Sequence, residues 1–274
     1  MRDSASDNRR KSELPSEIAA EPDMTLRHRL SALALALSAF VPTAAGAGDH
    51  CRDVEHLSET YTICTFDPAL EAIRIYGVPD GSTEPATYGA LRDRLRDDRE
   101  ALIFGMNAGM YHPDYSPVGL LVEDGKQRSP LNRADGEGNF FLKPNGVFYI
   151  GDGTAGVMET GAYAAAPPET TYATQSGPML VIDGAIHPRF LPQSDSLNIR
   201  NGVGMLPDGR VAFAISRRPV RFHDFATLFR DRLGCRNALY LDGSISSLYA
   251  PEVRRNDRFA QMGTVVMVVS TLPY

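Results

Sequence analysis

Tryptophan is absent from the 274 residues, and only three cysteines occur. Without tryptophan, any aromatic stacking on a sugar ring must come from tyrosine or phenylalanine. The formal net charge of −6 argues against nucleic-acid binding, which requires a clustered basic face. CxxC and HExxH motifs are also missing, so we expect neither a structural zinc site nor another metal or cofactor. The absence of a Gly-x-Ser-x-Gly turn disfavours a serine hydrolase.

Long apolar runs are lacking except near the N-terminus, where the twelve-residue run Leu30 to Val41 follows Arg27 and Arg29 and precedes small residues. A basic start, a short apolar run and a small-residue end are typical of a secretory signal peptide. Twelve residues are short for a bilayer span, which makes a membrane anchor the weaker alternative. We therefore predict a signal peptide over residues 24–47.

Three segments follow from this prediction. Residues 1–23 are unpatterned and are expected to be a disordered upstream extension, because the signal begins naturally at Met24. Residues 48–274 are expected to form one mature domain, which is large enough to bury a core. The predicted location is the periplasm or the exterior, without stable membrane insertion after signal cleavage.

Export places the cysteines in an oxidising compartment. Cys51 and Cys64 flank a hairpin-length segment, and we expect them to form a disulfide. Cys235 is then unpaired, and its position after Gly234 favours a buried small hydrophobic residue over a nucleophile.

Short strands and turns dominate the remaining sequence, and we expect strands over residues 140–143 and 173–181 among others. Two helices are predicted, one over residues 85–99 and one from Asp224 as N-cap to Gly234 as the stopping glycine. Residues 154–169 are expected to be a long surface loop. The predicted class is α+β, a single domain with a largely antiparallel, twisted β-sheet core and two main flanking helices.

The segment from Asn237 to Leu241 indicates a short buried strand that leads into a polar, glycine-containing turn. The turn carries the candidate site residues Asp242, Gly243, Ser244 and Ser247. A rigid apolar strand followed by a polar loop is a common way to present chemistry. The alternative is an ordinary turn, since Asp and Gly favour turns for local reasons.

Further segments combine polar side chains with glycine near strand ends. They contain Asn107, Gly109 and His112, then Gln175, Ser176 and Gly177, and finally Arg200 and Asn201. The first could equally be a glycine-relaxed turn, and the second could be a simple strand entry. Arginine suits phosphate because its planar guanidinium binds two oxygens. The anionic partner of Arg200 could be Asp242 or a bound phosphate.

Together these segments resemble the phosphodiester glycosidase family. The resemblance covers roughly residues 55–272 and rests on an ordered set of motifs: Asn107 to Tyr111, Gly177 to Leu180, Arg200 to Gly204 and Leu241 to Ser247. The segments Ser116 to Leu120 and Gly138 to Phe148 are similar to the bacterial periplasmic branch. Ala108 and Ser244-Ile245 stand where the family has glycines, so the substrate of its eukaryotic member is not expected to carry over.

The resemblance implies hydrolysis of the glycosidic bond in a sugar-1-phosphodiester. Arg200 would clamp the phosphate, Asp242 would act as base or nucleophile, and Asn107 and the other polar residues would orient the substrate, with His112 as a reserve proton carrier. A single obvious carboxylate leaves retention or inversion open. The alternatives are a non-catalytic glycan-binding protein and a phosphodiesterase that cleaves the P–O bond, which more often needs a metal.

Overall fold

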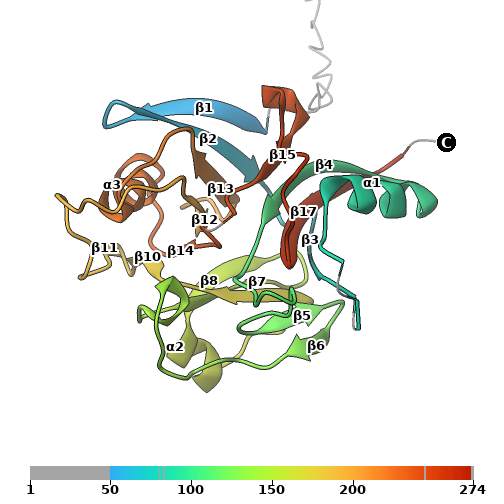
Figure 1. The fold of residues 1–274 in the computed structure, drawn as a ribbon, viewed down its shortest axis with the longest axis horizontal. Helices are drawn as coiled ribbons and strands as arrows, with labels where there is room; N and C mark the ends of the chain where they lie inside the picture. The colour runs from blue at the N-terminus through green and yellow to red at the C-terminus, as the bar shows by residue number, and fades with distance from the viewer. Residues whose placement is uncertain (1–49, 80, 83, 244, 273–274) are drawn as a thin grey trace, which may run out of the picture. The chain divides into compact units, whose positions relative to one another are not determined.

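Three antiparallel β-sheets surround the main core (Figure 1). The computed structural model describes residues 50–272 except 80, 83 and 244. The predicted upstream extension, the signal peptide and Ser244 therefore lie outside the described residues. The strand pairings among the described residues are all antiparallel, and three α-helices accompany them. This confirms the predicted α+β class.

The three sheets draw their strands from distant parts of the chain, and neighbours in each series below are hydrogen-bonded. The seven-stranded sheet contains β1 (Cys51–His56), β2 (Glu59–Phe66), β13 (Val211–Ser216), β12 (Asn201–Met205), β14 (Ala238–Tyr240), β10 (Met179–Ile182) and β11 (Ala185–Ile186). One five-stranded sheet contains β16 (Arg255–Asn256), β15 (Leu248–Ala250), β4 (Glu100–Asn107), β17 (Thr264–Thr271) and β3 (Ala72–Gly77). The other contains β6 (Lys126–Ser129), β5 (Leu121–Glu123), β9 (Tyr172–Ser176), β7 (Gly146–Ile150) and β8 (Ala155–Glu159).

The alternation of side chains along the strands assigns each sheet face to a different apolar cluster. In β17, Val266 and Val268 face the main core, whereas Val265 and Met267 face helix α1 (Tyr88–Asp97). The main core collects aromatic side chains from all three sheets, including Phe104, Phe148 and Phe213. Because both faces of β17 are buried, its sequence is a continuous apolar run rather than an alternating one.

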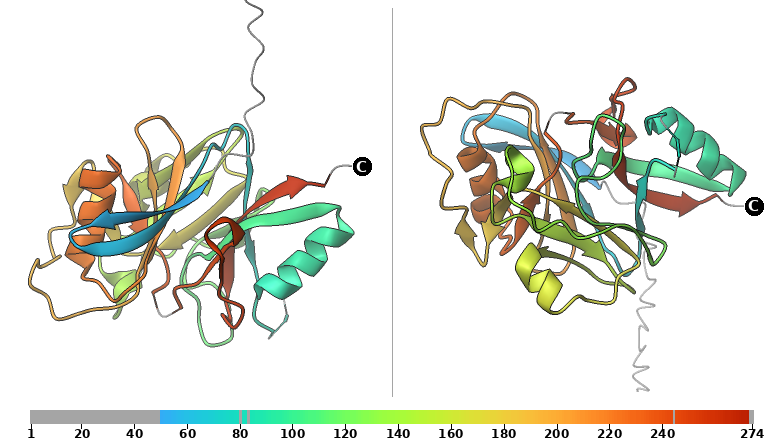
Figure 2. Two further views of the ribbon diagram at one scale, coloured as in Figure 1. Left: turned by 90° about the horizontal axis from the view of Figure 1, so that it is seen from above. Right: turned by 60° about the horizontal axis from the view of Figure 1, so that its bottom comes forward.

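The helices cover the outer faces of the sheets. Helix α1 packs on the sheet of β4 and β17, and α3 (Phe222–Thr227) with the π-helical turn η2 (Leu228–Arg232) packs on the seven-stranded sheet. These two helices lie on opposite sides of the described unit (Figure 2). Two 3₁₀ turns, η1 (Asn139–Phe141) and η3 (Pro251–Val253), complete the helical segments.

Two predictions about helix boundaries need correction. The first helix begins at Tyr88, not Pro85, because Thr87 is the N-cap and accepts a hydrogen bond from the backbone of Ala90. The second begins at Phe222, so Asp224 lies within its first turn instead of capping it. Gly234 adopts a φ of +71° after this helix, a left-handed conformation that glycine adopts without steric cost.

Three predictions about strands and loops are wrong. Residues 140–143 form no strand, since 140 and 141 belong to η1 and 142 and 143 are bends. The strand expected over residues 173–181 is interrupted at Gly177-Pro178, which are joined by a cis peptide bond. Residues 154–169 contain strand β8 and helix α2 (Thr160–Ala165) in place of a long loop. Pairing of β8 with β7 supplies backbone partners that local sequence does not reveal.

The cysteines lie as expected. Cys51 and Cys64 are directly opposite in the β1–β2 hairpin and form a disulfide. Cys235 is a buried free thiol, and burial raises its pKa to about 12, which favours the protonated form. Within the described segments, no helix is long and apolar enough to cross a membrane.

Removing the disulfide should lower the free energy of unfolding by about 3 kcal/mol, because the crosslink between residues separated by 13 positions restricts the unfolded chain. The test is urea unfolding of a double variant, Cys51→Ser with Cys64→Ser. Reductant should destabilise the wild type to the same extent and leave the double variant unchanged. A loss below about 1 kcal/mol would contradict the expectation.

Candidate active site

The ends of β4 and β14 meet where the candidate segments of the sequence converge. β12 pairs with β14 with Gly202 opposite Tyr240, and the backbone N–H of Leu241 donates to the carbonyl of Asn201. One residue further, the backbone N–H of Asp242 donates to the carbonyl of Ala108 at 3.0 Å. Two different sheets are thus joined directly beside Asp242.

Asn107, at the end of β4, holds this junction together. Its Nδ2 donates to the backbone carbonyl of Asp242 at 2.6 Å. Its Oδ1 accepts from the backbone N–H of Ser247 at 2.9 Å and from Nδ2 of Asn201 at 2.5 Å. The side chains of Asn107 and Asn201 are inaccessible to solvent, so they fix the loop around Asp242 and are not placed to contact a ligand.

Gly109 marks a place where two segments approach too closely for a side chain. A Cβ atom there would lie 2.3 Å from Thr174 Oγ1 and 2.5 Å from the carbonyl oxygen of Gln175. The Gln175 side chain is also occupied by protein contacts, since its Oε1 accepts from the backbone N–H groups of Leu120 and Asn132. Both predicted ligand-binding residues therefore support the loops beside the site.

Ser176 and Gly177 lie behind the segment of η1. A Cβ on Gly177 would lie 2.8 Å from the carbonyl oxygen of Phe140 and 2.7 Å from the Asn145 side chain, so the missing side chain permits this packing. The Ser176 hydroxyl is fully buried and has no hydrogen-bond partner among the described residues.

Arg200, which directly precedes β12, is fully buried. Its Nε donates to the carbonyl of Val220 at 2.8 Å and its Nη2 to the carbonyl of Ser196 at 3.0 Å. The guanidinium stacks 3.5 Å above the centre of the Phe222 ring. Nη1 has no hydrogen-bond partner among the described residues, and burial lowers the pKa of the guanidinium.

Tyr240 connects Arg200 with the loop that carries Asp242. Burial raises the pKa of the Tyr240 hydroxyl to about 12, while the charge of Arg200 lowers it and that of Asp242 raises it. A Cβ on Gly243 would lie 1.4 Å from the Tyr240 hydroxyl oxygen, so only glycine allows the loop to pass over this ring. Tyr240 therefore lies close both to the buried Arg200 and to the Asp242–Gly243 loop.

A cleft of about 440 Å³ opens above this arrangement. It is lined by residues 110–113 and 118, residues 137–141, and residues 242 and 245. Among the predicted site residues, Asp242 and the exposed His112 line the cleft, whereas the side chains of Asn107, Arg200 and Gln175 lie behind it.

Two residues that had no role in the sequence-based site line the cleft near these groups. Burial and then the negative charge of Asp242 raise the pKa of the Tyr111 hydroxyl, which donates to the carbonyl of Gln261 at 2.7 Å. Glu137 is a second carboxylate of the cleft. Its only sequence signal is its position between two glycines, where Gly138 adopts a φ of +91°.

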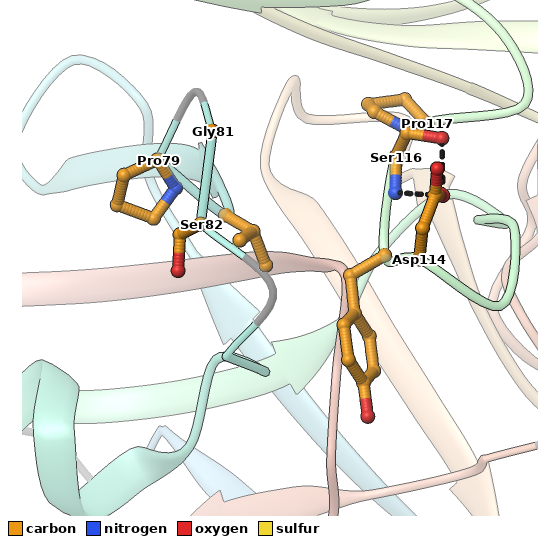
Figure 3. A pocket seen from close by; sticks show the side chains of 8 residues that line it. Pro79, Gly81, Ser82, Asp114, Ser116 and Pro117 are labelled. Carbon is orange, nitrogen blue, oxygen red and sulfur yellow. Dashed lines mark hydrogen bonds between the residues drawn. The ribbon is translucent and has the colours of Figure 1, made fainter.

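A second pocket, of about 290 Å³, lies between the segment of Pro79, Gly81 and Ser82 and the segment of Asp114, Ser116 and Pro117 (Figure 3). Its polar side chains include Ser82 and Asp114, and the Asp114 carboxylate accepts from both the backbone N–H and the hydroxyl of Ser116. These local contacts satisfy Asp114 within its own turn. Throughout residues 50–272, gaps aside, no group of three or more His, Cys, Asp or Glu side chains is arranged to hold a metal ion.

Replacing Asn107 with alanine should lower the free energy of unfolding by about 3 kcal/mol. The change leaves the buried N–H of Ser247 and the amide of Asn201 without their acceptor, and each unsatisfied group costs about 1–3 kcal/mol. Urea unfolding measures the loss. The exposed Asn256→Ala should stay within about 0.5 kcal/mol of wild type, and equal losses in both variants would refute the central role of Asn107.

Comparison with known proteins places this geometry in context. The sequence model of the phosphodiester glycosidase family matches residues 100–269. The chain is 36% identical over 226 residues to the uncharacterized protein YigE of Escherichia coli K12, and the match covers 82% of this chain and 87% of that protein. That relative agrees with the predicted bacterial branch.

Two solved structures share the fold. The catalytic domain of zebrafish N-acetylglucosamine-1-phosphodiester alpha-N-acetylglucosaminidase, auto-inhibited by its pro-peptide, aligns with a TM-score of 0.57 and 16% identity over 80% of this chain and 81% of that one. A hypothetical protein from Synechocystis aligns with a TM-score of 0.53 and 15% identity over 80% of this chain and 61% of that one. At these identities the likeness describes the fold alone.

Proposed function

The chain belongs to the phosphodiester glycosidase family, and on this premise we propose that it is an exported hydrolase that cleaves the glycosidic bond of a sugar-1-phosphodiester. The products are the free sugar and a phosphomonoester. The Cys51–Cys64 disulfide supports export, because such bonds persist in oxidising compartments. Residues 24–47 would supply the signal peptide.

The placement of Asp242 is the single observation on which the proposal chiefly rests. Its backbone is fixed from both sides, by Asn107 and by the carbonyl of Ala108, at a cleft large enough for part of a small glycan. A reactive carboxylate must be held in place by the rigid elements around it. The fixed strand ends supply that support.

In the proposed reaction the phosphate leaves from the anomeric carbon with the electrons of the C–O bond. The phosphomonoester that leaves is already a weak base, so its departure needs charge stabilisation more than protonation. Asp242 either attacks the anomeric carbon as a nucleophile or removes a proton from the attacking water. In the first case Glu137, on the same cleft, can deprotonate the water that releases the sugar.

In this proposal Arg200 does not bind the phosphate directly, as an arginine exposed in the cleft would. Its side chain is buried, and the Tyr240 ring and the Asp242–Gly243 loop lie close to it. We assign it as a positioning residue whose positive charge acts on the site through these groups. His112 lines the cleft itself and in this proposal contacts a phosphate oxygen or carries a proton.

Two alternatives make different predictions. A non-catalytic glycan-binding protein would bind the same ligands without turnover. A phosphodiesterase that cleaves the P–O bond would transfer the oxygen of water to phosphorus instead of to the sugar. Turnover and the destination of the water oxygen therefore separate both alternatives from the proposal.

Asp242→Asn should reduce kcat/KM on aryl and sugar 1-phosphodiesters by at least roughly a hundredfold, because the amide can act neither as base nor as nucleophile. The assay compares purified, disulfide-bonded variants over a panel that includes α-N-acetylglucosamine and α-glucose 1-phosphodiesters. Asp152→Asn, an exposed turn residue away from the cleft, is the matched control and should retain wild-type activity. Undiminished turnover in Asp242→Asn would overturn the assignment.

Hydrolysis in oxygen-18 water identifies the bond that breaks. Label in the released sugar supports glycosidic cleavage, and label in the phosphate supports the phosphodiesterase alternative. Binding of the same esters without release of any product would support the glycan-binding alternative.

Replacing Arg200 with methionine should lower kcat/KM by about tenfold or more, while Arg200→Lys should lose less because it keeps the positive charge. Methionine loses the hydrogen bonds to Val220 and Ser196, whereas the lysine ammonium keeps donors, so the stability of each variant is measured separately. Rates are compared per folded molecule and at several salt concentrations. Equal rates in the two variants would show that Arg200 has only a structural role.

A further inference from the structure

We propose that the Asp242 cleft contains a subsite for a hydrocarbon aglycone, so that the substrate is a sugar-1-phosphodiester of an alkyl, prenyl or aryl alcohol instead of one joined to a second sugar. This inference rests on the proposed function and names the substrate class of the same site. It is carried by the side chains that line the cleft beside Asp242 and by the way they are held.

Apolar side chains from three separate segments contribute to this lining. Met110 and Val118 come from the loop after β4, Phe140 and Phe141 from η1, and Ile245 from the loop after β14. No lysine or arginine is among the described lining residues, and the charged side chains are Asp242 and Glu137. The polar lining side chains (Tyr111, His112, Glu137, Asn139 and Asp242) would serve the sugar phosphate of the proposed function. Along the apolar part of the lining, the hydroxyls of a second sugar would lose water without gaining matching donors and acceptors.

The aromatic part of the wall is closely packed. The rings of Phe140 and Phe141 meet edge to face with centroids 5.0 Å apart. A Cβ on Gly136 would lie 2.8 Å from the Phe141 ring, so the backbone of this segment packs directly against that ring. Phe140 is almost fully buried, whereas Phe141 is half-buried and keeps part of its surface at the cleft. An apolar ligand would therefore meet a preformed surface.

Ile245 places aliphatic surface three residues after Asp242. The chain that follows it is fixed, because the Ser246 hydroxyl donates to the carbonyl of Ile199 at 3.0 Å and the Ser247 N–H donates to Asn107. Ile245 thus lines the cleft from a loop anchored on its C-terminal side. Ala108, the other departure from the family's glycines, is fully buried and bonded through its backbone, so it does not shape this wall.

The decisive comparison uses the hexyl and glyceryl esters of α-N-acetylglucosamine 1-phosphate and of α-glucose 1-phosphate, below the concentration at which the hexyl esters form micelles. The wild type should prefer the hexyl ester in kcat/KM by at least about tenfold. Ile245→Ala should reduce that preference by roughly threefold or more. Met110→Ala, which truncates a lining side chain on a different segment, should also reduce it. Leu70→Ala, which truncates a leucine that is 83% exposed, is the control and should leave the ratio unchanged.

Binding to Asp242→Asn, measured by calorimetry, tests the subsite independently of turnover. A hexyl preference of about tenfold in Kd that falls in a double variant with Ile245→Ala supports the subsite even if catalysis proves to be of another kind. Equal binding and equal turnover of the two esters would overturn the subsite while leaving the glycosidase proposal intact. Absence of turnover with a retained hexyl preference would overturn the glycosidase proposal alone.

Discussion

The hydrogen bonds of the Asn107 side chain are the constraint on which the candidate site depends. One buried amide fixes the backbone of Asp242, the N–H of Ser247 and the side chain of Asn201, and so joins the end of β4 to the loop after β14. In a buried setting each of these groups would be costly without its partner. The position of Asp242 is therefore set by the packing of two sheets and not by its own turn.

At three glycines the backbone passes so close to a neighbouring segment that no side chain fits. The chain passes over Tyr240 at Gly243, against Thr174 at Gly109 and against η1 at Gly177, and at each point a Cβ would collide with a neighbour. These glycines let the segments behind the cleft pack closely, whereas larger side chains line the cleft itself. The division explains why many motif residues lie behind the cleft while Asp242, His112 and Ile245 line it.

The charges of Arg200 and Asp242 both act on Tyr240, which lies close to each of them. Arg200 is buried on Phe222 with its charge directed toward Tyr240, and Asp242 lies above them at the cleft. A buried cation of this kind acts more strongly than a solvated one because the surrounding dielectric constant is lower. In the proposed reaction, the apolar side chains that line the cleft beside Asp242 would favour hydrocarbon aglycones.

Local patterns in the sequence were enough to predict the α+β class, the cysteine pairing, the two main helices and the candidate segments, because these depend on periodicity, turn residues and motif order. Helix α2 and strand β8 were missed because their stability comes from pairing with β7 and from the buried side chain of Tyr163. The division between motif residues that line the cleft and those that lie behind it emerged from the tertiary fold. The fold buried Arg200 and Asn107 and brought Glu137 to the cleft of Asp242, since contacts between distant segments cannot be read from local sequence.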